Sequence, residues 1–298
     1  MTGVQTCALP ISATEGLVPV RSVKGTSTVT NFNVGESTLG KVVPGVTPEG
    51  AKSQLSKNNV TIDTLVYARA HIALLETFQT QFDVRQKIGM EHGKKIAKFK
   101  DQAFLIQGIK AALATTSSYG STPGYFGGSQ ETLANINDLK DPAKMYSAFA
   151  RLFAQIEEKD VDPVDDNLAI FVRPDVYYTL LQSEYVVNGE YKTSDGTNVK
   201  GKVFEAWGVP VISTNNLPRS VISGHLLSNS DNGDAYDGDF SNVGALVMSP
   251  ETLLAGQNIA LETDVFFDKL SKQWFADAHL AFAAAPNRNE YSGVILLP

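Results

Sequence analysis

Residues 60–113 read VTIDTLVYARAHIALLETFQTQFDVRQKIGMEHGKKIAKFKDQAFLIQGIKAAL. A short β-branched strand signal at the start leads through an apolar segment into a helical pattern. From Ile88 onward, steps of four and three residues keep one stripe facing a core, at His92, Ile96, Phe99, Ala103, Ile106, Lys110 and Leu113. The pattern predicts one helix from about Asp83 to Leu113, roughly 46 Å long at ~1.5 Å per residue. We expect a helix of this length to serve a structure larger than one subunit.

Five lysines of this segment fall mostly off the predicted stripe: Lys87, Lys94, Lys95, Lys98 and Lys100. The simplest interpretation is a solvated helix face. The alternative is contact with DNA phosphates, each contact weak and sensitive to salt. We expect any such contact to be independent of base sequence.

The composition bounds the class of protein. The chain has 298 residues, of which 43% are apolar and 19% charged, with a formal net charge of -7. These values suit a soluble, globular protein with one large domain or two unequal ones. No apolar run approaches the ~18 residues of a membrane span. The acidic balance argues against a protein whose whole surface grips nucleic acid.

The first twelve residues, MTGVQTCALPIS, resemble the conceptual translation of a sequencing adaptor. A secretory signal is the alternative, but the stretch lacks a basic start and has only a broken apolar core. We therefore expect residues 1–12, and with them the one cysteine, Cys7, to be foreign to the natural gene product. A chain without cysteine has no disulfide framework or thiolate metal site, which fits a reducing compartment.

Before the helix, residues 13–59 are rich in Thr, Ser, Gly and Val and carry two alternating runs, at 18–23 and 28–34. Turn residues follow from Gly35 to Gly50. The pattern predicts an extended hairpin or long loop with little core of its own, and a floppy terminal segment is the alternative. Because an isolated two-stranded ribbon is marginal in water, we expect this one to lie on another surface.

Beyond the helix, helices and strands alternate. A Gly-rich mobile loop is predicted at 115–137, followed by a helix with Asp141 as N-cap, Pro142 in the first turn, and a buried face at Met145, Phe149, Leu152, Phe153 and Ile156. Strands are predicted at 168–172, 209–213 and 243–248, a helix at 174–182 and a helical turn at 201–206. A long β-hairpin and a closing strand are predicted from Ile259 to Leu297. The mixture indicates an α+β or α/β fold.

No catalytic motif emerges. The Gly-rich loop lacks the spacing of a phosphate cradle, no G-x-S-x-G elbow is present, and Glu157 and Glu158 lie in a charged linker. Four histidines lie far apart in the chain, which disfavours a shared metal: His71, His92, His225 and His279. Four acidic residues keep calcium open as a ligand, although the order of an EF-hand loop is missing: Asp231, Asp234, Asp237 and Asp239. We assign no catalytic, cofactor-binding or metal-binding residue.

Four groups of motifs carry a family resemblance. They are Val60-Thr61-Ile62-Asp63 followed by Phe82-Asp83-Val84-Arg85; Phe171-Val172-Arg173-Pro174-Asp175-Val176-Tyr177; Trp207-Gly208-Val209-Pro210-Val211 with the turn at Asn215 and Asn216; and Ala285-Pro286-Asn287-Arg288-Asn289-Glu290. With the order of elements they cover most of residues 20–298. The chain resembles the major capsid proteins of tailed double-stranded DNA phages with the Hong Kong 97-type fold, and among them the short-tailed podovirus type.

The resemblance implies an α+β capsid fold and a structural, non-enzymatic role without cofactors. It implies self-assembly into the hexamers and pentamers of an icosahedral head around double-stranded DNA. Scaffolding protein and portal would be partners during assembly in the bacterial host cytoplasm, no membrane would be involved, and the final location would be the virion.

The implied domains are an arm remnant plus extended loop at 13–60, which reaches over a neighbouring subunit, and a peripheral domain at 61–141 with the spine helix at about 83–113. An axial domain follows at 142–247, and a peripheral β return at 248–298.

Three alternatives stay open at this point. An encapsulin-like compartment would share the fold. A calcium-binding enzyme or binding protein would be built around the 231–239 loop. Covalent cross-linking between subunits would use lysines of the extended loop, of which Lys41, Lys52 and Lys57 are candidates, although no partner asparagine is identified.

Overall fold

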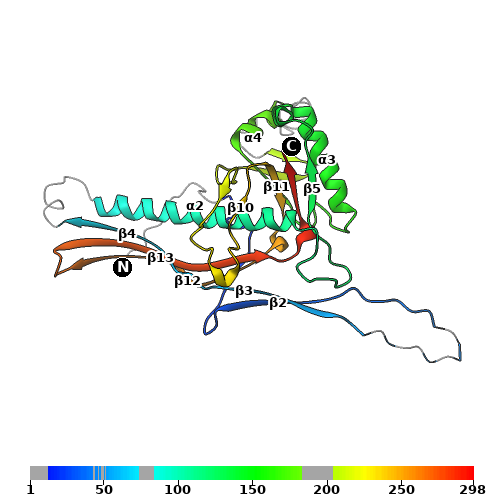
Figure 1. Cartoon of the computed structure of the whole chain (residues 1–298), viewed down its shortest axis with the longest axis horizontal. Helices are drawn as coiled ribbons and strands as arrows, with labels where there is room; N and C mark the ends of the chain where they lie inside the picture. The colour runs from blue at the N-terminus through cyan, green and yellow to red at the C-terminus, as the bar shows by residue number, and fades with distance from the viewer. Residues whose placement is uncertain are drawn as a thin grey trace, which may run out of the picture.

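The computed structural model describes residues 13–42, 52–73, 84–182 and 204–298, together with positions 44, 45, 47 and 50. The adaptor-like residues 1–12 lie outside this range. The described chain has three parts: a long β-ribbon with a helix along it, a projecting hairpin, and a second sheet flanked by two shorter helices (Figure 1).

The ribbon is a four-stranded sheet in the order β1-β12-β13-β4. Strands β12 (Leu253–Asp268) and β13 (Gln273–Pro286) form the predicted C-terminal hairpin. Strand β4 (Val66–Ala73) pairs with β13, and β1 (Val20–Ser22) runs parallel to β12 near its base. Helix α2 (Val84–Leu113) lies along the ribbon, so the long helix predicted from the sequence is confirmed.

The burial of α2 differs from the single stripe that the sequence predicts. Ile96, Ala103 and Ile106 are buried as expected, but between residues 103 and 112 nearly every side of the helix is covered. The reason is that this half lies between two sheets: Phe104 meets Phe282 of the ribbon edge-on, and Gly108 lies against Met248 and Leu246 of the second sheet. Only the first half of α2 is amphipathic.

The second sheet has six strands in the order β5-β14-β11-β6-β8-β7. Their bounds are β5 Ser129–Thr132, β14 Ser292–Leu296, β11 Val243–Met248, β6 Ala169–Val172, β8 Val209–Ser213 and β7 Phe204–Ala206. Helices α3 (Pro142–Glu157) and α4 (Pro174–Leu181) pack with it, and Asp141 caps α3 by accepting hydrogen bonds from the N–H groups of Ala143 and Lys144, as predicted. Short elements complete the set: β9 Val221–Ile222, β10 Gly238–Asp239, η1 Ile136–Lys140, η2 Ser230–Asn232, η3 Pro250–Thr252 and η4 Asn289–Tyr291.

Two local predictions are wrong. The described part of the helical turn predicted at 201–206 is strand β7, which pairs with β8 through a tight turn at Trp207 and Gly208, both with positive φ. The range 115–137, predicted as a loop, contains strand β5 and the first residues of η1, and its glycines Gly127 and Gly128 pack against the end of α2. A Cβ on Gly127 or Gly128 would lie 2.4 Å from backbone atoms at the end of α2. The glycines there serve close contact with the helix.

The predicted N-terminal hairpin is confirmed. Strands β2 (Thr28–Val34) and β3 (Leu55–Thr61) pair with each other and run below the ribbon in the view of Figure 1. At its base, Val29, Val60 and Ile62 are buried against Leu254, Ala281 and Ala283 of the ribbon. Full burial of a Val, Leu or Ile side chain contributes about 1.5–3 kcal/mol to the free energy of folding. At the other end of β2, the Tyr125 hydroxyl donates to the carbonyl of Val34 at 3.1 Å and Glu36 N–H donates to the carbonyl of Pro123 at 3.0 Å. The ribbon therefore holds the start of the hairpin, and the 119–125 loop holds its far end.

A buried carboxylate joins α2 to two distant segments. Asp101 Oδ1 accepts hydrogen bonds from the N–H and hydroxyl of Thr14, at 2.8 and 2.7 Å, and its Oδ2 accepts one from Asn216 Nδ2 at 2.7 Å. The Asp101 side chain is fully buried. It thereby fixes the N-terminal segment and the loop after β8 to the middle of the helix.

Substituting Asp101→Asn is expected to lower the free energy of unfolding by about 1–3 kcal/mol, because an amide has one acceptor oxygen where donors approach from both sides. Urea unfolding measures the change. The exposed control Asp231→Asn is expected to leave stability within about 0.5 kcal/mol of the wild type. Equal stabilities of Asp101→Asn and wild type would contradict this role.

Candidate assembly surfaces

A polar cluster fastens the hairpin to the body. Asn31 Nδ2 donates to the hydroxyl of Tyr119 at 3.1 Å and to Asn287 Oδ1 at 3.3 Å, while Tyr119 itself donates to Asn287. Asn58 Nδ2 donates to the carbonyl of Pro286 at 2.7 Å. Burial raises the pKa of the Tyr119 hydroxyl, so the group stays a neutral donor. These bonds fix the direction in which the hairpin leaves the body.

The cluster continues through the motif at 285–290. The Arg288 guanidinium lies 4.4 Å from the ring centroid of Tyr291 and 5.2 Å from that of Tyr125, and its Nε donates to Glu290 Oε1 at 2.8 Å. Glu290 is buried, so this ion pair and the two aromatic contacts hold Arg288 in one position. The motif is thus a structural junction between the ribbon and the second sheet.

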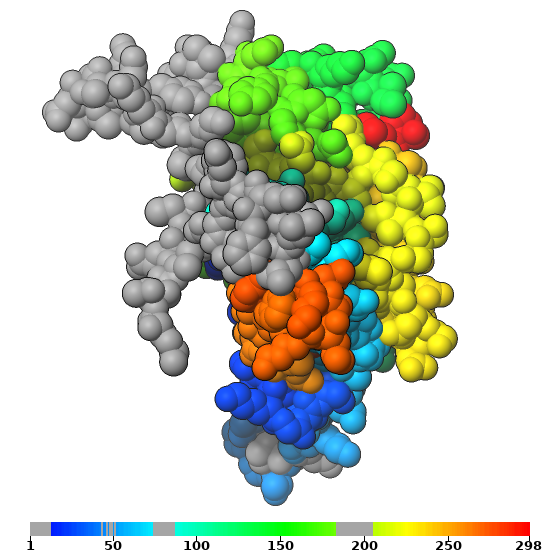
Figure 2. Space-filling view, turned by 90° about the vertical axis from the view of Figure 1, so that its left-hand side faces the viewer, coloured from blue at the N-terminus to red at the C-terminus, as the bar shows by residue number. Residues whose placement is uncertain are grey.

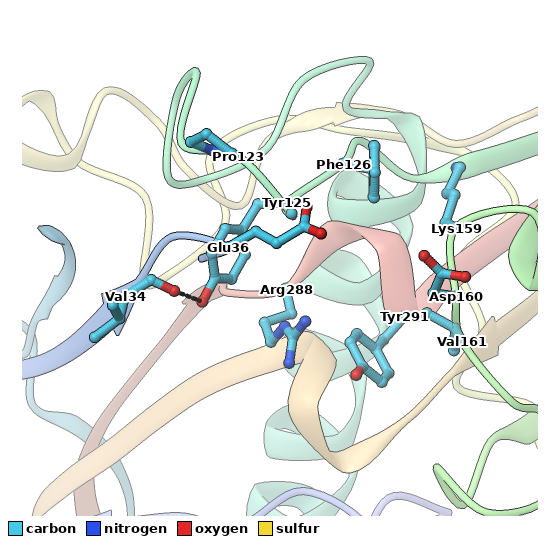
Figure 3. Close-up of a pocket in the computed structure, with 11 residues that line it drawn as sticks. Val34, Glu36, Pro123, Tyr125, Phe126, Lys159, Asp160, Val161, Arg288 and Tyr291 are labelled. Atoms are coloured by element: carbon cyan, nitrogen blue, oxygen red, sulfur yellow. Dashed lines mark hydrogen bonds between the residues drawn. The ribbon is translucent and has the colours of Figure 1, made fainter. Parts of the chain in front are cut away.

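A cavity of about 260 Å³ opens beside this junction, between the far end of β2 at Val34 and Glu36 and the residues that follow α3 (Figure 3). In Figure 3 the side chains of Glu36, Tyr125, Arg288 and Tyr291 surround the space, and the Tyr125 hydroxyl donates to the carbonyl of Val34 at 3.1 Å. Lys159, also in its wall, donates to the carbonyls of Gly127 and Gly128 and to Ser129 Oγ. Arg288 and Lys159 thus both hold structural partners in the wall of this cavity.

The two faces of the hairpin differ in kind. One face carries Val29, Asn31 and Asn58, which contact the body. The other carries Phe32 and Val34 on β2 and Leu55 on β3, and it points away from the body. Phe32 is 73% exposed and Leu55 is 77% exposed. Three neighbouring exposed apolar side chains, bordered by Lys57, are typical of a contact with another protein surface.

The first half of α2 bears the predicted lysine face. Lys87, Lys94, Lys95 and Lys98 are exposed on one side of the helix, and Lys94 pairs with Glu91 at 3.1 Å. Lys100 lies apart from them: it is partly buried, its Nζ stands 5.6 Å from the Phe104 ring centroid, and burial lowers its pKa. The exposed lysines form a short basic stripe on an otherwise acidic chain.

The acidic loop uses its carboxylates internally. Asp237 accepts hydrogen bonds from Ser228 Oγ and from the N–H groups of His225 and Gly224, which together lower its pKa. Asp239 lies next to Ser241 and accepts a hydrogen bond from its N–H, while Asp231 and Asp234 point to solvent. Within the described ranges, no three or more His, Cys, Asp or Glu side chains converge as metal ligands. The structure gives the calcium alternative no support.

The histidines are separated in space as well as in sequence. His71 and His279 lie on β4 and β13, and His92 on α2. His225 lies between the rings of Phe99 and Tyr236, stacked at centroid distances of 5.0 and 5.2 Å. Its Nδ1 accepts a hydrogen bond from Leu227 N–H, so the neutral tautomer carries its proton on Nε2. His225 is a packing residue that fixes the 223–237 loop to α2.

We expect His225 to make stability depend on pH. Burial lowers its pKa below the ordinary 6.5, although Asp237 opposes the shift. The unfolded chain therefore binds the proton more readily. The stabilising contribution of the neutral, buried His225 is fully present above pH 6.5, and it is lost as the pH falls through the folded-state pKa. In His225→Phe, urea unfolding at pH 7.5, 6.5 and 5.5 is expected to show a smaller loss on acidification than in wild type. Parallel losses in both proteins would contradict this.

The candidate cross-linking lysines, Lys41, Lys52 and Lys57, are all exposed in the extended loop. Lys57 lies directly opposite Phe32 on the outward face of the hairpin. No contact in the described chain singles out one of them.

Three residues with structural roles have no place in the motifs of the sequence: Asn31 and Tyr119 of the polar cluster, and the buried Asp101. A signal existed for Asp101, since it is a lone acidic residue at the edge of an apolar helical run. No local signal links Asn31, Tyr119 and Asn287, because the fold brings them together from three distant segments. No helix among the described residues has the length and apolar content needed to cross a bilayer.

Comparison with known proteins adds independent findings. A family model described as "Gp10A-like: Major capsid protein" matches residues 49–267. The capsid of cyanophage P-SCSP1u superposes with a TM-score of 0.81 at 16% identity, covering 100% of this chain and 90% of that one. The mature capsid of bacteriophage PhiM1 gives 0.78 at 21%, with the same coverage, and Mycobacterium phage Che8 gives 0.60 at 12%, covering 91% and 85%. None of the curated proteins compared with the chain matched it.

Proposed function

Since the chain belongs to the Gp10A-like family of major capsid proteins, it is a shell protein of a phage virion, and we propose that it forms the hexamers and pentamers of an icosahedral head around double-stranded DNA. The Hong Kong 97-type, α+β fold predicted from the sequence is confirmed. Its role is structural, and we propose that it catalyses no reaction. The family match favours a phage head over an encapsulin-like compartment.

One observation carries the proposal: the body holds the hairpin β2–β3 along one face, and the opposite face exposes the apolar side chains of Phe32, Val34 and Leu55. A lone arm gains nothing from exposing Phe32 and Leu55 to water. Laid over a neighbouring subunit, the same side chains would be buried, and each subunit would both give and receive an arm. Such a head-to-tail contact closes into rings, as hexamers and pentamers require.

We propose the domain division that the resemblance implies. The extended loop occupies residues 13–60, the peripheral domain 61–141 and 248–298, and the axial domain 142–247. The core of 142–247 supports it, with α3, α4, β6, β8 and β11 packed in one cluster. Strands β5 and β14, from the flanking ranges, complete that sheet and join the two domains firmly.

The basic stripe of α2 is proposed to face the packaged DNA. Lys94, Lys95 and Lys98 would contact phosphates without reading bases. Scaffolding protein and portal are proposed partners during assembly in the host cytoplasm, on the strength of the family alone.

The test is negative-stain electron microscopy of the expressed chain, with and without residues 1–12, alone and together with a co-expressed scaffolding protein. Closed shells or hexameric rings are expected. Monodisperse monomers under both conditions would contradict assembly.

A further inference from the structure

The outer half of β12 is an open sheet edge. Strand β1 pairs with β12 only from Ala255 to Gln257, and beyond that point β12 pairs with β13 alone among the described residues. At the other side of the ribbon, β13 is likewise the one strand that pairs with β4 within the described ranges. Figure 2 looks onto the free end of this ribbon, where the orange turn between β12 and β13 projects. Open edges present unpaired backbone groups that proteins normally cover or block.

The charges on one face of the ribbon are unbalanced across its strands. Arg69 on β4 pairs with Asp277 on β13 at 2.6 Å, and Asp277 lies directly opposite Asp264 on β12. Two carboxylates in opposite positions repel each other. Within the described chain Asp264 has no ion pair, and Asp277 Oδ1 is buried without a hydrogen-bond partner. Across the ribbon this row therefore holds the Arg69 guanidinium, the Asp277 carboxylate and the Asp264 carboxylate. It carries one excess negative charge, at Asp264 on the open edge.

In the neighbouring row of the same face, Glu262 lies 3.7 Å from His279 Nε2 of β13, so Asp264 is the carboxylate of this edge that has no cationic neighbour in its row on β13. The β12 edge carries Glu262 and Asp264, while the β4 edge carries Tyr67, Arg69 and His71. The β12 edge thus carries two carboxylates beside the aromatic Phe266, and the β4 edge carries a guanidinium between an aromatic ring and an imidazole. Both strands run antiparallel to β13, so they run parallel to each other, and a second ribbon could continue the sheet in the same orientation.

We propose that the open edge of β12 pairs with β4 of a second copy of this chain, which places Asp264 beside Arg69 of that copy. The pairing extends the ribbon from one subunit to the next and completes the charge row with the missing cation. It joins one edge to a different edge, so it is a head-to-tail contact of the kind that closes rings. The inference rests on the proposed shell function and adds a second subunit contact, distinct from the hairpin.

Engineered disulfides test the pairing directly. The variant carries Cys7→Ser, Tyr67→Cys and Glu262→Cys, the last two in one row of the ribbon. Within one chain these cysteines are separated by β13, about 9.5 Å at two strand spacings, whereas a disulfide needs Cα atoms within about 7 Å. A bond can therefore form only between copies. On a non-reducing denaturing gel we expect a ladder of covalent oligomers that collapses with reductant.

The matched control pairs Tyr67→Cys with Val265→Cys, because Val265 points to the opposite face of β12. No ladder is expected from it. If the variant with Tyr67→Cys and Glu262→Cys forms normal shells but gives no ladder, the edge contact is overturned and the proposed shell function is not. Failure of the wild type to assemble at all would overturn the proposed function, and this contact with it.

A charge swap supplies the second readout. Asp264→Arg is expected to raise the concentration needed for assembly by about tenfold or more, since two guanidinium groups would then meet at the contact. Within the chain the new arginine faces Asp277, so folding is retained. Adding Arg69→Asp restores an opposite-charge pair between copies and is expected to restore assembly. Assembly of Asp264→Arg at the wild-type concentration, or no rescue in the double variant, would overturn the pairing.

Discussion

Gly256→Ala is expected to dislodge the hairpin and abolish shell formation. Gly256 lies in β12 where β2 crosses it, and a Cβ there would stand 2.3 Å from Val29 Cγ2. Val29 is buried and branched at Cβ, so it cannot turn away within its rotamer. The clash is expected to cost about 2–3 kcal/mol, as for other overpacked cores. Since the hairpin would leave its place on the ribbon, its outward face would no longer meet a neighbour.

The double variant Gly256→Ala with Val29→Ala provides the control, because it removes the carbon that clashes. We expect the double variant to lose less free energy of unfolding than the sum of the losses in the two single variants. The expected difference, the coupling energy, is about 1–2 kcal/mol. Urea unfolding gives the coupling energy, and electron microscopy scores the shells. Normal shells from Gly256→Ala alone would show that hairpin placement does not govern assembly.

The second large effect is expected from the outward face itself. Phe32→Ser combined with Leu55→Ser should leave the free energy of unfolding within about 0.5 kcal/mol of wild type, because both side chains are largely exposed in the subunit. Burying each one at a contact contributes about 1.5–3 kcal/mol. Their loss is therefore expected to raise the assembly concentration at least about 100-fold. Sedimentation velocity across a concentration series measures this threshold.

The apolar replacement Phe32→Leu with Leu55→Val is the matched control, and we expect it to assemble near the wild-type concentration. If the serine variant assembles as readily as this control, the outward face is not a subunit contact. If the serine variant also unfolds more easily, the hairpin face would instead be part of the fold of one subunit.

The elements that the sequence predicts well have strong local signals. Asp141 and Pro142 mark the start of α3 because a carboxylate cap and a ring without N–H both suit a first helical turn. The spine helix and the long C-terminal hairpin follow from their periodicity. The strand β7 was missed because its three residues have no alternation, and its turn uses Trp207 and Gly208 with positive φ where sequence rules expect Asn or Asp before Gly.

The assembly surfaces were predicted only in outline. The sequence indicates a ribbon that needs a surface, but it cannot say that Asn31, Tyr119 and Asn287 meet, since each is an ordinary polar residue in its own segment. The all-round burial of α2 after residue 103 also depends on two sheets formed elsewhere in the chain. Phe32 and Leu55 point outward because Val29, on the opposite face of the hairpin, packs against the ribbon. That packing is a tertiary contact, which the local sequence does not specify.

The most direct test of the central claim is a cryo-electron microscopy reconstruction of shells assembled from this chain. We predict that the hairpin β2–β3 lies over the adjacent subunit, with Phe32 and Leu55 buried in the contact. Shells in which both side chains face solvent, or a chain that stays monomeric with its scaffolding protein, would contradict the account.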